Sequence, residues 1–66
     1  MPKLSGSVRF VMYVGSAGYW RWELLTKNGK TVADSGNEYS SRAACRAAIV
    51  RVQRLVRLAS VVVEAQ

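Results

Sequence analysis

The sequence predicts an α+β fold: a three-stranded antiparallel sheet, one amphipathic helix packed on one face of that sheet, and a C-terminal strand. Two segments in the first half alternate between apolar and polar residues, which is typical of half-buried strands. A segment in the second half repeats its apolar residues at helical spacing and contains neither glycine nor proline. The predicted order is therefore β-β-β-α-β in a single domain, residues 1–66.

The first strand is predicted over residues 8–14, after a polar stretch, residues 1–7, that we expect to be flexible. Its alternation places every second residue on one apolar side: Val8, Phe10, Met12 and Val14. A turn follows over residues 15–18. It contains two glycines, which supply the positive φ angles that hairpins need.

The second strand is predicted over residues 19–26, with Trp20, Trp22 and Leu24 sharing one face. The pair Asn28-Gly29 then gives the strongest short hairpin signal in the chain. It leads into a short third strand over residues 31–35.

The helix is predicted over residues 42–59, and Ser40 or Ser41 can cap its N-terminus by accepting a backbone N–H bond. At about 100° per residue its apolar side chains fill one arc of roughly 140°. This arc contains Ala44, Cys45, Ala48, Ile49, Val52, Leu55, Val56 and Ala59.

The tail after the helix, residues 60–64, is rich in valine and predicts a fourth strand. No hairpin partner precedes it in sequence, so it needs a sheet edge in its own chain or in another one.

Length and composition favour a partner chain. A domain of 66 residues buries only about 60% of the surface that its unfolded chain exposes. Small domains usually supplement a small core with disulfides or a bound metal. With one cysteine and no histidine, this chain can form neither an intrachain disulfide nor a typical zinc site. Half of the residues are apolar, which also favours association, and a homodimer is the predicted state.

The predicted location is the cytoplasm. The first ten residues contain no long apolar run, and the valines of the tail are too few to cross a bilayer. The sequence therefore predicts neither a signal peptide nor a membrane span, and a lone cysteine fits a reducing compartment.

Four motifs occur in order along the chain. They are Gly18-Tyr19-Trp20-Arg21-Trp22-Glu23-Leu24, Asn28-Gly29-Lys30, Ala33-Asp34-Ser35-Gly36 and Tyr39-Ser40-Ser41-Arg42-Ala43-Ala44-Cys45. In these motifs the chain resembles the YegP-like family, small bacterial and archaeal proteins built on domain of unknown function 1508. The resemblance covers residues 10–56.

The resemblance implies a β-β-β-α unit that occurs as two tandem copies or as one copy that dimerises. Because this chain holds one copy, the resemblance also favours a homodimer. Two features depart from the family pattern: Gly15-Ser16-Ala17 replaces the usual aspartate or lysine of the first turn, and Asn37-Glu38 adds a residue before Tyr39. The family has no agreed catalytic residues, so the resemblance leaves the function open.

The sequence predicts no enzyme. A nucleophilic or acid–base site needs a nucleophile, a base and a group that orients the base. Asp34 and Ser35, near Tyr39, are the polar cluster that could supply these groups, but such turn residues usually accept backbone N–H bonds. One thiol and four scattered acids form no metal-ligand cluster, and no cofactor or small-molecule substrate is predicted.

Cys45 raises a further hypothesis, a thiol-dependent redox or transferase role. The helix dipole and the nearby Arg42 and Arg46 could lower the pKa of its thiol. Its position in the centre of the apolar arc favours packing instead.

Two surfaces are candidates for contact with partners. The sheet face away from the helix and the tail are predicted to meet a second copy through Val11, Tyr13, Leu25, Val61, Val62 and Val63. The aromatic residues interleaved with Arg9 and Arg21 could instead stack on single-stranded nucleic acid, although Trp20 and Trp22 lie on the predicted core face.

The arginines of the helix form the second surface. The net charge is +6, and Arg42, Arg46, Arg54 and Arg57 lie along one side of the helix, with Arg51 at its border. Within the helix no acid stands three or four residues away, so this face could bind nucleic acid phosphates or an acidic protein. The alternative is a solvated face whose arginine stems cover Val50 and Leu58.

Overall fold

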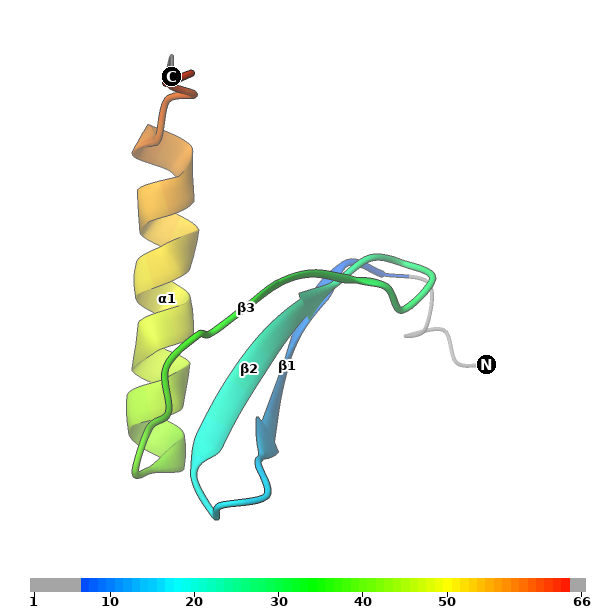
Figure 1. Cartoon of the computed structure of the whole chain (residues 1–66), viewed down its shortest axis with the longest axis vertical. Helices are drawn as coiled ribbons and strands as arrows, with labels where there is room; N and C mark the ends of the chain where they lie inside the picture. The colour runs from blue at the N-terminus through cyan, green and yellow to red at the C-terminus, as the bar shows by residue number, and fades with distance from the viewer. Residues whose placement is uncertain (1–6, 65–66) are drawn as a thin grey trace.

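The computed structural model describes residues 7–64 (Figure 1). It contains β1 (Arg9–Val14), β2 (Trp20–Leu25), β3 (Thr31–Asp34) and α1 (Arg42–Leu58). The sheet has the order β1-β2-β3, and both strand pairs are antiparallel. The predicted α+β class and the order of these four elements are confirmed. Apart from Ser7, the stretch predicted to be flexible lies outside the described residues.

Both hairpins close with a glycine in the left-handed region. Gly18 has a φ of 88° and Gly29 a φ of 87°, and each donates its backbone N–H to the carbonyl three residues earlier at 2.9 Å. All non-glycine residues in the described part have negative φ, so Asn28 does not adopt the conformation of a two-residue Asn-Gly turn. The prediction that both glycines of the first turn supply positive φ is wrong for Gly15, which does not lie in the left-handed region.

The chain stays beside β2 after β3 ends. Ser35 donates its backbone N–H to Trp22, and Tyr39 exchanges both backbone hydrogen bonds with Trp20, at 2.8 and 2.9 Å. This pairing brings the chain to the start of α1, where the backbone N–H of Ala44 donates to Oγ of Ser41 at 3.1 Å. Ser41 is therefore the N-cap.

The core is very small. Its buried side chains are Trp22, Cys45 and Ile49, which are 5%, 0% and 8% exposed. The ring of Phe10 meets Trp22 edge-on, with centroids 5.3 Å apart, and Trp20 packs against the same cluster while partly buried. The sheet therefore meets the helix through both β1 and β2, against residues 45–52 of α1.

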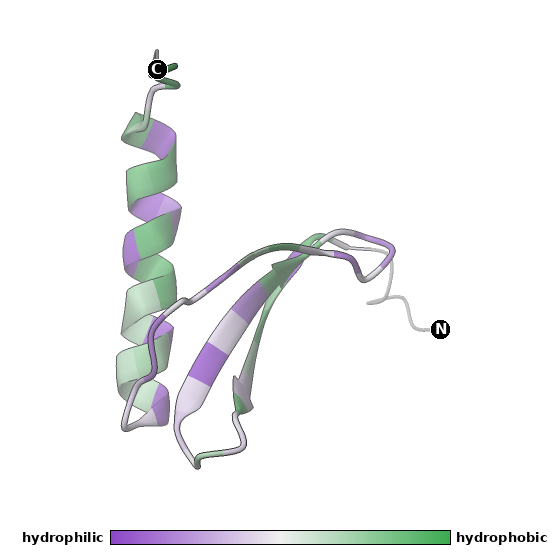
Figure 2. Ribbon diagram, viewed as in Figure 1, coloured by the Kyte–Doolittle hydropathy of each residue, from purple (hydrophilic) through white to green (hydrophobic). Residues whose placement is uncertain are grey.

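The second half of α1 extends beyond the sheet. Leu55 is 53% exposed, Val56 66% and Leu58 82%, although the first two lie on the predicted apolar arc. Figure 1 shows the reason: helix and sheet lie close at the N-terminal end of α1 and diverge toward its C-terminal end. Figure 2 shows that hydrophobic residues continue along the helix into this uncovered half.

The tail forms no strand within the described chain. Residues 59–64 are irregular and join no sheet, and Val61, Val62 and Val63 are 93%, 74% and 90% exposed. The predicted fourth strand is thus wrong for pairing within one chain. The reason is geometric, since the last turns of α1 carry the tail away from the sheet (Figure 1).

Candidate functional site

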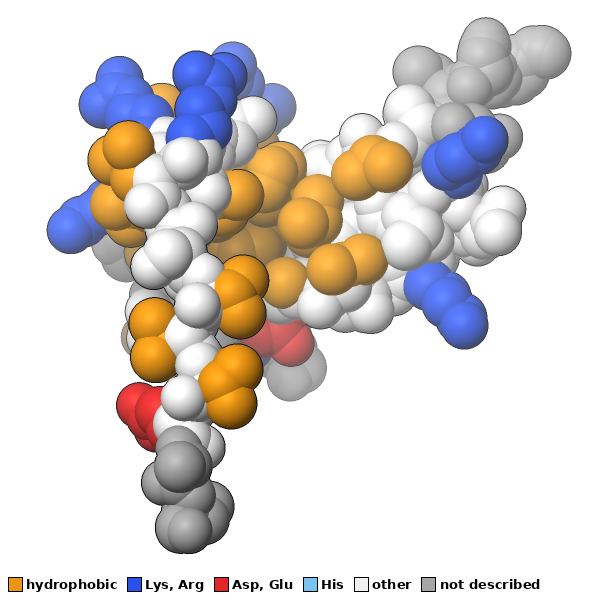
Figure 3. Space-filling model, turned by 90° about the horizontal axis from the view of Figure 1, so that it is seen from above, with side chains coloured by type: hydrophobic (Ala, Val, Ile, Leu, Met, Phe, Trp, Pro, Cys, Tyr) orange, Lys and Arg blue, Asp and Glu red, His pale blue; other side chains and the backbone are white. Residues whose placement is uncertain are grey.

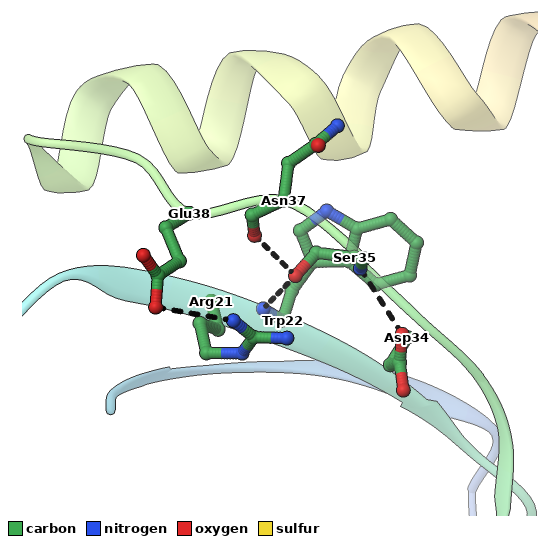
Figure 4. Close-up of polar contacts among 7 residues, drawn as sticks. Arg21, Trp22, Asp34, Ser35, Asn37 and Glu38 are labelled. Atoms are coloured by element: carbon green, nitrogen blue, oxygen red, sulfur yellow. Dashed lines mark hydrogen bonds and ion pairs between the residues drawn. The ribbon is translucent and has the colours of Figure 1, made fainter. Parts of the chain in front are cut away.

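The polar cluster before the helix acts as a turn. Oδ1 of Asp34 accepts the backbone N–H of Gly36 at 3.0 Å, and Oγ of Ser35 accepts that of Trp22 at 3.4 Å (Figure 4). The hydroxyl of Ser35 also donates to the carbonyl of Asn37 at 2.8 Å. These bonds give both side chains the structural role predicted from the sequence.

The outer face of the sheet, away from the helix, carries a polar network. Arg21 contacts Glu38 at 3.4 Å, the one ion pair found among residues 7–64 (Figure 4). A hydrogen bond with the hydroxyl of Tyr13 raises the pKa of the Arg21 guanidinium above its ordinary value, so Arg21 stays positively charged. Glu38 belongs to the loop that departs from the family pattern, and sequence reasoning missed its partner because the two residues are far apart in sequence.

The predicted contacts on this outer face are only moderately exposed. Val11 is 37% exposed, and Tyr13 and Leu25 are half-buried among their neighbours. The polar groups of Arg21 and Glu23 lie on the same face of β2. This face therefore needs less hydrophobic cover than the sequence led us to expect.

Cys45 is enclosed by the core. Burial raises the pKa of its thiol, which is the opposite of what a reactive cysteine requires. Within residues 7–64 no group of three potential metal-ligating side chains comes together. Nor does any helix in this part of the chain combine the length and apolar character needed to cross a membrane.

An uncovered apolar surface lies on both flanks of α1. One open hollow of about 630 Å³ is lined by Phe10, Leu24, Val52 and Val56, with Arg54 and Arg57 among its polar lining. A second hollow of about 670 Å³ on the other flank is lined by Trp22, Tyr39 and Leu55, among others. Sequence reasoning missed these hollows. A helix of about 25 Å beside strands of six residues was the signal that could have indicated them.

Trp22, which lines the second hollow, contains a buried polar atom. Nε1 of Trp22 has no hydrogen-bond partner among the described residues. Leaving a buried donor unsatisfied costs about 1–3 kcal/mol, so a structure that supplied an acceptor here would be more stable.

The helix arginines are all exposed. Arg42, Arg46, Arg51, Arg54 and Arg57 lie on α1, which contains no acidic residue. Figure 3 shows several basic side chains gathered at one end of the molecule, with no acidic side chain among them, and further basic side chains at the opposite end. Their stems leave Val50 40% and Leu58 82% exposed, so they do not cover Leu58 as the solvated-face hypothesis requires.

These features define a small α+β domain with two uncovered surfaces, one apolar and one basic, and nothing in the described residues points to catalysis. A protein-family model, described as "Domain of unknown function (DUF1508)", matches residues 16–62. The chain therefore belongs to this family, the YegP-like family.

A solved structure supports the same fold. It is described as "NMR solution structure of the protein from Haloferax volcanii" and aligns with a TM-score of 0.80 and 32% sequence identity. The alignment covers 89% of this chain and 98% of the Haloferax volcanii one. A comparison with curated proteins finds no match.

Proposed function

We propose that this chain is a non-enzymatic, homodimeric module with a structural or protein-interaction role. The observation that carries the proposal is the imbalance between its core and its exposed apolar surface. Three side chains are buried, whereas large apolar residues such as Leu55, Val56 and Val61 are more than half exposed. A domain this small needs a supplement to its core, and with one cysteine no disulfide can form within the chain.

A second copy is the occupant that the structure favours, because the unsatisfied parts complement one another. Among residues 7–64 of each chain the tail is unpaired, and β1 and β3 pair only with β2, which leaves one edge of each strand open to a partner. In a two-fold dimer each tail can join an edge of its partner, and both copies gain the same contacts. Of the predicted dimer contacts, Val61, Val62 and Val63 therefore carry this proposal further than Val11, Tyr13 and Leu25.

The hollows beside α1 support the same arrangement. A partner seated against Val56 and Phe10 would cover the exposed half of the helix. A partner that also reached the second hollow, which Trp22 lines, could bring an acceptor, or enclose a water, next to Nε1 of Trp22. The proposal places the protein in the cytoplasm, where Cys45 stays reduced.

Mass measurement in solution at micromolar concentration tests the dimer. The wild-type chain should show twice its chain mass of 7.3 kDa. Val56→Asp should dissociate it, because Val56 lines a hollow, while Val8→Asp should not, because Val8 lines none of the hollows described. The two valines are matched in exposure, at 66% and 64%. A folded, soluble wild-type monomer would contradict the proposal.

A second candidate function is sequence-independent nucleic-acid binding by the arginine face of α1, defined as Arg42, Arg46, Arg54 and Arg57. The observation that favours it is that no carboxylate of the described residues forms an ion pair with these arginines. An acidic protein surface is the competing partner. If Arg46, Arg54 and Arg57 were changed to Gln and DNA affinity and its salt dependence stayed unaltered, this face would not be the site.

A further inference from the structure

The surroundings of the arginine face indicate which form of nucleic acid it suits. We propose that it binds the phosphate backbone of a double-stranded nucleic acid and discriminates against single strands. This inference rests on the proposed nucleic-acid binding and specifies its ligand.

The first argument is the absence of stacking groups. Proteins that bind single strands combine a basic groove with aromatic side chains on which bases stack. α1 contains no aromatic residue. Trp22 is buried, and Phe10, Trp20 and Tyr39 pack against it, so these rings are committed to the core. Phe10 shares a hollow with Arg54 and Arg57, but its ring packs edge-on against Trp22. On α1 itself a single strand would therefore find cations without stacking partners.

The second argument is the shape of the arginine face. From Arg42 to Arg57 the helix rises about 22 Å, so the four guanidinium groups project from one rigid rod. A duplex is also rigid and carries one negative charge per about 1.7 Å of its axis. A flexible single strand would lose conformational entropy to follow the same rod. The match of a rigid cationic row with a rigid anionic backbone favours the duplex.

The third argument is that these charges are available. The carboxylates of the sheet and its loops are engaged elsewhere: Glu38 with Arg21, Glu23 with the hydroxyl of Thr31, and Asp34 with a backbone N–H. The arginine face thus has no ion pairs to break on binding. Contacts to phosphates carry no base information, so the binding is independent of sequence.

Fluorescence anisotropy on a labelled 20-base-pair DNA and on one of its strands, across a KCl series, tests the inference. Wild-type protein should bind the duplex about tenfold more tightly than the strand near 0.1 M salt. Four phosphate contacts per chain predict a slope of log affinity against log salt near −3.6, because each contributes about −0.9.

Two variants with the same loss of charge complete the experiment. Arg46→Gln with Arg54→Gln should weaken duplex binding at least tenfold and reduce the slope by about 2. Lys27→Gln with Lys30→Gln removes two cations from the exposed turn between β2 and β3 and should weaken it less than about threefold. Circular dichroism should show an unchanged helix in both.

The outcomes distinguish the preference for a duplex from nucleic-acid binding itself. Equal or tighter binding of the single strand, still lost on substitution of Arg46 and Arg54, would overturn the duplex inference and leave nucleic-acid binding standing. No saturable binding to either DNA would overturn both. So would equal losses in the two variants, since these would show an effect of net charge alone.

Discussion

Cys45 has the most enclosed side chain in the described part of the chain, and its chemistry follows from that enclosure. Its thiol lies against Trp22 and Ile49 in the core. A thiolate there would lose its hydration without gaining a cationic partner, so burial raises the pKa. The cysteine is thus a packing residue, and its sequence position near Arg42 and Arg46 does not make it reactive.

The first prediction concerns stability at alkaline pH. The folded state holds the Cys45 proton more tightly than the unfolded state does, so unfolding is favoured wherever the unfolded thiol ionises first. The stability from this group is fully present below its ordinary pKa of 9.0 and is lost as pH rises through the higher folded pKa. Urea unfolding from pH 7 to 11 should therefore show a steeper decline for wild type than for Cys45→Ala. Parallel curves would contradict the prediction.

The second prediction concerns alkylation of the same thiol. Native protein should react with iodoacetamide far more slowly than protein unfolded in urea, because Cys45 is 0% exposed. The ratio of the two rates, followed by mass spectrometry, measures the protection. Fast reaction of the folded chain would restore the hypothesis of a thiol-dependent activity.

At the scale of the elements, the N-terminus of α1 depends on one hydroxyl. Ser41 accepts the backbone N–H of Ala44, whereas Ser40, its exposed neighbour, is one position outside the cap. The third prediction is that Ser41→Ala lowers the free energy of unfolding by about 1 kcal/mol. Ser40→Ala, the matched control, should change it by less than about 0.5 kcal/mol. Equal effects in urea unfolding would show that the cap is not where the structure places it.

The elements were predictable because their determinants are local. Glycine at the turns, alternation in the strands and the uninterrupted helical period are readable in windows of a few residues. The extent of burial was not predictable in this way. Leu55 and Ile49 lie on the same apolar arc, but only Ile49 meets the sheet, because the angle between helix and sheet depends on tertiary packing.

The candidate surfaces also divide into local features, which the sequence predicts, and contacts between distant segments, which it does not. The sequence places four arginines on one side of the helix, since helical spacing alone decides that arrangement. It could not show that Glu38 pairs with Arg21, or that Nε1 of Trp22 lacks a partner, because both depend on contacts between distant segments.

At the scale of the whole molecule, the chain is open rather than compact. Its Cα radius of gyration is 13.9 Å, whereas a compact domain of this length has a radius near 11 Å. The diverging helix and sheet account for this shape, and the exposed tail adds to it (Figure 1). In the proposed homodimer, a chain that buries so little of its apolar surface would gain its stability from association, so folding and dimerisation are expected to be one equilibrium.

The last prediction follows from that coupling and tests the role of the tail. For a dimer that unfolds to two chains, a tenfold rise in protein concentration adds about 1.4 kcal/mol of stability, so the urea midpoint should increase with concentration. Val62→Pro removes a backbone hydrogen-bond donor, so it should lower the urea midpoint if the tail pairs with a strand of the partner. Val62→Thr is the control, because it keeps both the donor and the β-branched shape and should leave that pairing in place. In the isolated chain Val62 is 74% exposed and joins no strand, so without a partner both substitutions should be neutral. A midpoint independent of concentration, together with a neutral Val62→Pro, would therefore show that the single chain is the folded unit.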